Sequence, residues 1–140
     1  MALAHDATLS HPTRAWLMAP AALSLLAGLD AALLLAGVAA PVHSGVLPAR
    51  HGVLMTLGFL GTLIALERAV ALRVAWGYAA PGLLGAGGLA LTLGLPVHVG
   101  AVLLADGSAV LLAVYAMLYR RQRDESTAVE SLAAVAATGA

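Results

Sequence analysis

Four residues with a helical spacing could form a chemical site. His51, Met55, Gly58 and Thr62 follow one another at intervals of three or four residues within the apolar segment 50–70. Such intervals place side chains on one face of an α-helix. Imidazole is a common ligand of iron, copper and zinc, and glycine lets a flat group approach the backbone closely. This face is therefore either a cofactor-binding surface or a surface that packs against another helix.

Two aspartates form a second candidate site. Asp30 and Asp106 interrupt segments that are otherwise apolar. They lie about 15 Å and about 14 Å from the ends of these segments, close to the depth of about 16 Å obtained for Thr62. Ionisable groups in such segments usually face the interior of a helical bundle. Two roles are open for them: neutral acids that stabilise packing, and groups that handle protons or ions.

The composition indicates an integral membrane protein. Of the 140 residues, 61% are hydrophobic and 10% are charged, whereas soluble domains carry about 25% charged residues. The segment Val74–Ala105 contains no Lys, Arg, Asp or Glu. An apolar run of roughly 18 residues or more predicts a membrane span. Because lipid offers no partners for backbone polar groups, we expect these spans to be helices.

The composition also excludes several classes of function. The net charge is zero, so nothing indicates a nucleic-acid partner. The chain has no cysteine, which excludes disulfides and thiolate metal sites. It shows no nucleophile–base arrangement, glycine-rich phosphate loop or zinc motif. The sequence therefore gives no support for a hydrolase or a nucleotide-driven pump, and it favours a protein that is not an enzyme.

We expect an all-α membrane protein with four transmembrane helices in an antiparallel bundle over residues 15–120. The apolar segments place these helices at about residues 15–40, 51–72, 76–95 and 97–119. Each is long enough to cross about 30 Å of hydrocarbon. Residues 1–14 form a polar lead, and the prolines and glycine of residues 41–50 predict a loop. Pro96 should end the third helix.

Small residues at four-residue intervals predict close helix packing. The first predicted helix carries Ser24, Gly28, Ala32, Ala36 and Ala40, and the third carries Gly82, Ala86, Ala90 and Gly94.

Arginine placement predicts the orientation. Arg50 alone lies at the opposite end from six other arginines, which lie at the start, the second turn and the tail: Arg14, Arg68, Arg73, Arg120, Arg121 and Arg123. Positive residues concentrate in cytoplasmic segments. We therefore expect a bacterial-type cytoplasmic (inner) membrane protein with both termini in the cytoplasm.

The tail, residues 121–140, combines a charged segment with an apolar stretch. Thr127 and Glu130 have the spacing of a capping box, which predicts a new helix beginning near Ala128. We expect this stretch to be the start of a further span, and the chain to be the N-terminal part of a larger polytopic protein. Its partners would be the lipid bilayer and either those further helices or a second copy of the chain.

The run of His51, Met55, Gly58 and Phe59 resembles the signature of the NnrS family of membrane proteins. Its His-Gly opening, followed by a methionine one turn later, is also similar to the haem-ligating span of the haem–copper oxidase superfamily. The resemblance covers about residues 50–72. It implies a haem, with copper as a second metal, and a link to nitric oxide or redox stress. His51 would be the metal ligand, and Met55, Gly58 and Thr62 would line the cofactor.

Three functions follow from these patterns. The first is an NnrS-like haem- or metal-binding protein that uses His51. The second is a small proton-coupled transporter or channel subunit that uses Asp30 and Asp106 near the membrane midplane. The third is a structural membrane subunit without a site.

Overall fold

The computed structural model describes residues 11–42 and 45–138, with side chains for 14–42 and 45–121. The predicted polar lead lies mostly outside these residues. Every regular element among the described residues is a helix. In chain order they are α1 (His11–Leu35), α2 (Leu47–Val53), the π-helix η1 (Leu54–Gly61), α3 (Thr62–Leu72), the 3₁₀-helix η2 (Ala75–Tyr78), α4 (Ala79–Thr92) and α5 (Val97–Thr138).

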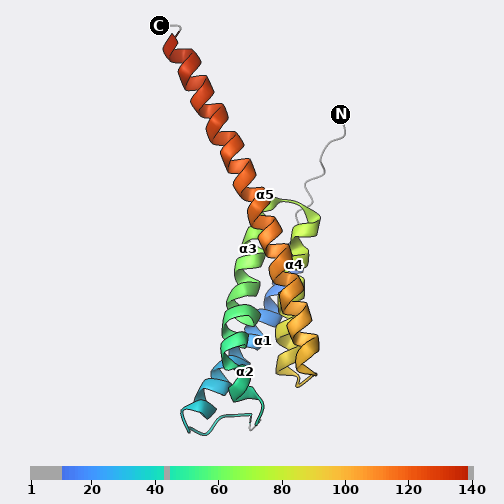
Figure 1. Ribbon diagram of the computed structural model, residues 1–140. Coiled ribbons are helices and arrows are strands. Elements are labelled where there is room, and N and C mark those ends of the chain that lie inside the picture. The colour runs from blue at the N-terminus through green and yellow to red at the C-terminus, as the bar shows by residue number, and fades with distance from the viewer. Residues whose placement is uncertain (1–10, 43–44, 139–140) are drawn as a thin grey trace.

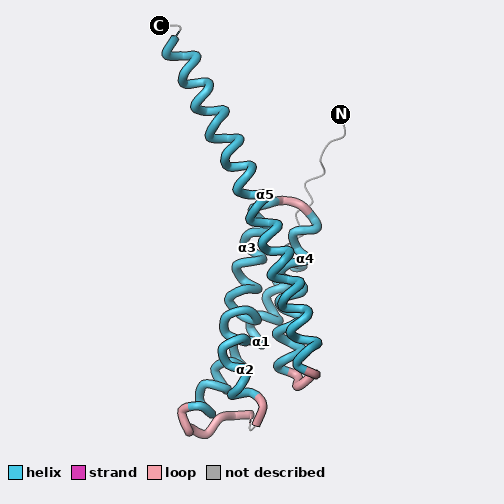
Figure 2. Tube along the Cα trace, viewed as in Figure 1, coloured by secondary structure: helices cyan, strands magenta, loops and turns pink. Residues whose placement is uncertain are grey.

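The helices run side by side in alternating directions (Figures 1 and 2). The elements α2, η1 and α3 follow one another without a break and form one rod that leads back along α1. The chain then reverses through η2 into α4, and α5 returns beside α4. Among the described residues, helix α1 contacts the rod and α4 but not α5. The rod and α4 therefore separate α1 from α5.

Three helices are long and apolar enough to cross a membrane. They comprise residues Arg14–Leu35, Leu47–Leu72 and Val97–Arg121. Helix α4 has 14 residues and is shorter than the predicted third span, residues 76–95. The described part of the chain thus contains three helices with the length and composition of a membrane span, where the sequence predicted four.

Glycines set two of the helix ends. Gly37 has φ 70°, and the amide of Val38 donates to the carbonyl of Leu33 over 2.9 Å. Gly94 has φ 78° and ends α4 in the same way, a Schellman motif that pairs the last carbonyls of a helix. The predicted helix ends at residues 40 and 95 were therefore too late.

The rod begins at Leu47, four residues earlier than predicted, because Pro48 suits the first turn of a helix. Its middle is the π-helix η1. A π-helix has a wider turn than an α-helix, and it occurs often at functional sites. Along it the buried positions Leu54, Gly58 and Thr62 recur every four residues. The π-helix thus keeps the predicted face turned towards α1 and α4.

The interface between α4 and α5 is built from glycines that receive leucines. A Cβ atom on Gly87 would lie 2.7 Å from Cγ of Leu104, and one on Gly107 would lie 2.8 Å from Cγ of Leu84. Leu84 and Leu104 are almost fully buried. Each helix thus provides both the leucine and the glycine groove that receives a leucine.

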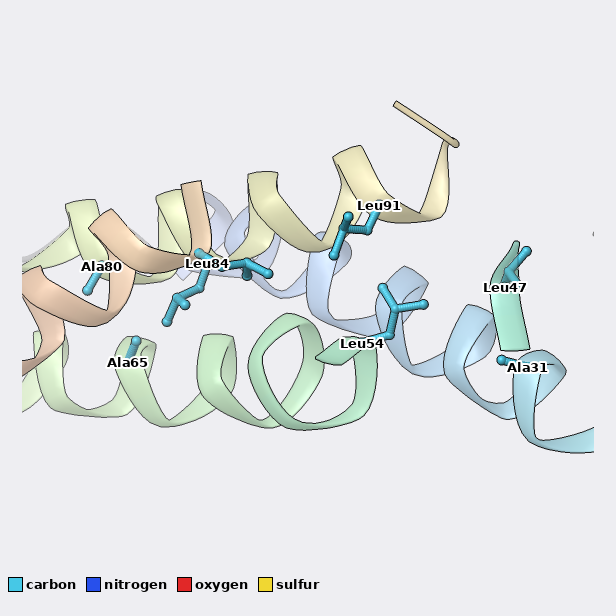
Figure 3. Packing of buried hydrophobic residues seen from close by; sticks show 8 residues of the cluster. Ala31, Leu47, Leu54, Ala65, Ala80, Leu84 and Leu91 are labelled. Atoms are coloured by element: carbon cyan, nitrogen blue, oxygen red, sulfur yellow. The ribbon is translucent and has the colours of Figure 1, made fainter. Parts of the chain in front are cut away.

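The core between α4 and the rod is small and apolar. Figure 3 shows Leu54, Leu84 and Leu91 pointing into this space, with Ala65 and Ala80 facing each other across it. Short side chains at this point allow the helices to approach closely, as in membrane helix pairs.

The predicted packing stripe of the third helix was wrong. A Cβ atom on Gly82 would have no neighbour within 4 Å, Ala86 is exposed, and Gly94 lies in the turn after the helix. Of that stripe, Ala90 alone is buried. The contacts of α4 come instead from positions such as Gly85 and Gly88, because the helix is rotated relative to the predicted face.

The structure also differs from the prediction in the tail. Helix α5 runs unbroken from Val97 to Thr138, so no new helix begins near Ala128. Its C-terminal half extends beyond the other helices (Figure 1). The charged segment after Arg120 continues the helix rather than ending it.

We expect Gly88→Ala to destabilise the bundle. A Cβ there would collide with the hydroxyl of Ser24 and would lie 2.9 Å from Cα of Gly58. Overpacking of this kind costs about 1–3 kcal/mol. The matched control is Gly82→Ala in the same helix, where the added methyl meets open space. Thermal unfolding in detergent should show a lower midpoint for Gly88→Ala alone, and equal midpoints would contradict this packing.

Candidate functional site

The structure brings His51, Met55, Gly58 and Thr62 together on the side of the rod that faces α1 and α4. The Nδ1 atom of His51 donates to the carbonyl of Gly28 over 2.8 Å, because a carbonyl can only accept. The side chain of Met55 lies against Gly28. Both residues thus contact one point of α1, where glycine leaves room for them.

Further along this face the helices are in direct contact. A Cβ on Gly58 would lie 2.9 Å from Oγ of Ser24 and 3.3 Å from Cα of Gly88. Thr62 is fully buried, and its hydroxyl donates to the carbonyl of Gly58 over 2.8 Å. The backbones of η1 and α4 and the side chain of Ser24 therefore fill the space beside Gly58 and Thr62.

These contacts determine whether a haem has space beside this face of the rod. A porphyrin ring needs an open slot beside the helix, and protein atoms occupy that position next to Met55, Gly58 and Thr62. These three residues therefore do not fit a haem. His51 differs, because its Nδ1 is held by a backbone carbonyl and its Nε2 is the ring atom left for a metal. Such a contact commonly orients a ligating histidine.

Among the described residues, no group of three or more His, Cys, Asp or Glu side chains could hold a metal ion.

Asp30 is the second candidate group, and its surroundings are more unusual than those of His51. The residue is 7% exposed. Oδ1 accepts a hydrogen bond of 3.1 Å from the amide of Val42, in the segment that follows α1. Oδ2 is buried and has no hydrogen-bond partner among the described residues. Buried polar atoms in folded proteins are nearly always paired, so this oxygen indicates a missing donor.

Asp30 lines a groove of about 550 Å³ between α1, the segment after it, and the start of the rod. The lining is otherwise apolar, apart from Thr92 near the end of α4. The hydroxyl of Thr92 already donates to the carbonyl of Gly88 over 2.9 Å. The groove therefore combines a large apolar surface with one acidic residue, Asp30, whose Oδ2 has no donor among the described residues.

The structure does not bring Asp30 and Asp106 together. Asp106 is exposed on α5, and in the described part of the chain α5 does not contact α1. The two residues have similar depths along their helices, but the rod and α4 lie between them. A path linking both carboxylates is therefore absent from the described part of a single chain.

Two arginines have a structural role that the sequence analysis missed. Arg50 donates from Nη1 to the carbonyl of Leu91 over 2.6 Å, and Arg121 donates in the same way to Leu72 over 2.8 Å. Leu91 and Leu72 lie at the C-terminal ends of α4 and α3. A cation there can bond the last carbonyls of a helix and interacts favourably with the helix dipole. The predicted turns after each helix could have indicated these carbonyls, but not which arginine reaches them.

Ser24 was predicted as a packing residue, and its close contact with two other helices could not be seen in the sequence. It is fully buried, and its Oγ has no hydrogen-bond partner among the described residues. Most other hydroxyls in the helices bond a carbonyl four residues earlier, as Thr62 and Thr92 do. Ser24 instead lies against Gly58 and Gly88, where three helices meet.

A family model described as a domain of unknown function, DUF8744, matches residues 14–140. The chain belongs to this family. No curated protein and no solved structure matches it. The matched range includes the Asp30 groove, the face of the rod that contacts α1 and α4, and both arginine contacts. These features are therefore parts of the DUF8744 domain itself.

Proposed function

We propose that the protein is an integral membrane protein of four spans. Three helices have the required length and composition. The fourth span would be η2 together with α4, which reach about 29 Å when 3₁₀ and α-helical rises are added. Large apolar side chains on the outer surfaces of α1 and α5 support this proposal: Leu26, Leu35, Val102 and Leu112 are more than half exposed. Lipid would cover these surfaces.

We further propose that both termini lie in the cytoplasm of a bacterial-type inner membrane. In Figure 1, the turn after α3 and the C-terminal half of α5 lie at the same end of the bundle. Most arginines belong to this end. Arg50 is the exception at the other end, and its bond to the end of α4 gives it a structural reason to be there.

Cysteine labelling should test this orientation, because the chain contains no cysteine of its own. Gly45 and Ala75 are exposed and lie at opposite ends of the rod. We expect Gly45→Cys to react with a membrane-impermeant maleimide in intact cells. Ala75→Cys should react only after permeabilisation. The reverse pattern would contradict the orientation, and equal labelling of both in intact cells would contradict membrane insertion.

The function that the geometry supports best is proton or cation handling at Asp30. A single observation carries this proposal: Oδ2 of this buried aspartate has no donor among the described residues, although the residue lines an open apolar groove. Ionisable groups in membrane helices are functional sites by default. No other ionisable side chain among the described residues lines the groove.

Asp106 has a different place in this proposal. It is exposed on α5 between apolar residues, where an aspartate facing lipid is unfavourable. A second copy of the chain, or further helices, would cover this part of α5. Asp106 would then contact a partner helix rather than the groove.

Reconstituted liposomes should separate the roles of the two aspartates. With an imposed pH gradient and an internal pH dye, we expect the wild type to dissipate the gradient faster than empty liposomes. Asp30→Asn should reduce the rate to that of empty liposomes, because it removes the acidic group. Asp106→Asn removes the same charge outside the groove and should retain the rate. Equal rates for the wild type and Asp30→Asn would contradict the proposal.

A haem held by His51 is a second candidate function. The NnrS resemblance motivates it, and the contact from Nδ1 to Gly28 supports it because Nε2 is left for a metal. The cofactor would have to lie away from Gly58 and Thr62. Nitric oxide or redox stress would be the setting that the resemblance implies.

A visible spectrum of the purified protein should test this second candidate. If His51 ligates a haem, a Soret band is expected, and His51→Ala should abolish it. His98→Ala is the matched control, since His98 is exposed at the start of α5. A protein without a Soret band, or a band that His51→Ala leaves unchanged, would rule out the ligand role.

A further inference from the structure

Three arginines come together at one end of the bundle, where α3 and α5 lie side by side. The guanidinium carbon of Arg68 lies 5.7 Å from the centre of the Tyr115 ring, which is a cation–π contact. One turn further along α3, the carbonyl of Leu72 accepts a hydrogen bond of 2.8 Å from Nη1 of Arg121. Arg73 follows directly in the turn. These three arginines form an arginine cluster on α3, its following turn and α5.

The arginine cluster is open to its surroundings. Arg73 and Arg121 are exposed, and the side chain of Arg68 is 37% exposed. Nε of Arg68 is buried, so its terminal nitrogens are the donors that this exposure leaves. An incoming group can therefore reach a guanidinium group from each of the three positions.

The charge around the cluster is positive. Residues 67–73 and 120–125 together carry five arginines against three acids: Arg68, Arg73, Arg120, Arg121 and Arg123 against Glu67, Asp124 and Glu125. Among the side chains that the structure describes, Glu67 is the acid at this end, and it lies 3.3 Å from Arg68. Its side chain is 68% exposed, and exposed ion pairs contribute little. The cluster thus has an excess of positive charge that favours an anion.

Aromatic side chains indicate where this anion lies. Trp76 follows Arg73 by three residues, and Tyr119 precedes Arg121 by two. Both are exposed, as is Tyr115. Trp and Tyr concentrate where a membrane meets water, at the level of the lipid headgroups. Basic clusters at this level bind anionic headgroups, so a lipid phosphate fits the position better than an anion from solution.

We propose that the arginine cluster binds the phosphate of an anionic phospholipid between α3 and α5. The phosphate oxygens accept hydrogen bonds from Arg68, Arg73 and Arg121, because planar guanidinium groups suit phosphate. The acyl chains remain in the bilayer beside the two helices. This inference rests on the proposed insertion into a membrane, and it goes further by specifying the lipid that the protein selects.

Fluorescence of Trp76 can report on this site. The chain has two tryptophans, so Trp16→Phe leaves Trp76 as the single one, close to Arg73. The full chain carrying this change is reconstituted in phosphatidylcholine liposomes. Either phosphatidylglycerol or phosphatidylcholine with acyl chains brominated near the headgroup is then included at equal fractions. We expect brominated phosphatidylglycerol to quench Trp76 more strongly than brominated phosphatidylcholine, because the cluster enriches the anionic lipid.

Variants of the cluster should weaken this preference. We expect Arg68→Gln and Arg73→Asn each to reduce it about fivefold, the effect of removing one arginine beside an anionic surface. Asparagine tolerates the left-handed backbone of Arg73, whose φ is 56°, so this exposed variant decides the matter if Arg68→Gln does not fold. Arg50→Gln removes the same charge at the other end of the bundle and should retain the preference.

The outcomes separate this inference from the proposed function. Equal quenching by the two lipids, or a preference that both folded variants of the cluster retain, overturns the inference and leaves membrane insertion standing. Loss of the preference on adding inorganic phosphate would assign the site to a free anion and would also overturn it. Absence of quenching by either lipid would contradict insertion itself, and both proposals would then fail.

Discussion

Close approach of three helices at glycine is the constraint on which this structure depends. Gly58 and Gly88 lie against each other and against Ser24, so the backbones of η1 and α4 are almost in contact. In lipid, helices gain little from burying apolar surface, and close van der Waals contact takes its place. The same contact leaves no space for a cofactor beside Gly58. It also brings α1 near enough for His51 to reach Gly28.

Several polar side chains of this bundle serve the backbone rather than one another. Arg50 and Arg121 bond carbonyls at helix ends, His51 bonds a carbonyl inside α1, and Asp30 accepts from an amide. Unpaired backbone groups are very unfavourable in an apolar medium. Three of the few charged side chains of this chain, Arg50, Arg121 and Asp30, therefore bond backbone groups at or just beyond helix ends. Asp30 stands out because only one of its two oxygens is used in this way.

The positions of the helices could be predicted from the sequence because long apolar runs determine them. The helix ends were harder to predict, since Gly94 fitted a packing stripe as well as a left-handed cap, and Gly37 lay within an unbroken apolar run. Of the predicted face of the rod, Gly58 and Thr62 are buried, and they belong to a four-residue repeat of buried positions that begins at Leu54. That face is covered by α1 and α4, which are distant from the rod in the sequence. No local pattern could show that Ser24 would fill it.

The two aspartates show why depth alone does not define a site. A residue count gives the height of a side chain along its helix, and by this measure Asp30 and Asp106 match. The direction in which each points depends on which neighbours the helix has. Helix α1 has the rod and α4 beside it, whereas α5 shows Asp106 to the outside. A single acid facing an apolar groove cannot pass a proton to a second carboxylate within the described chain.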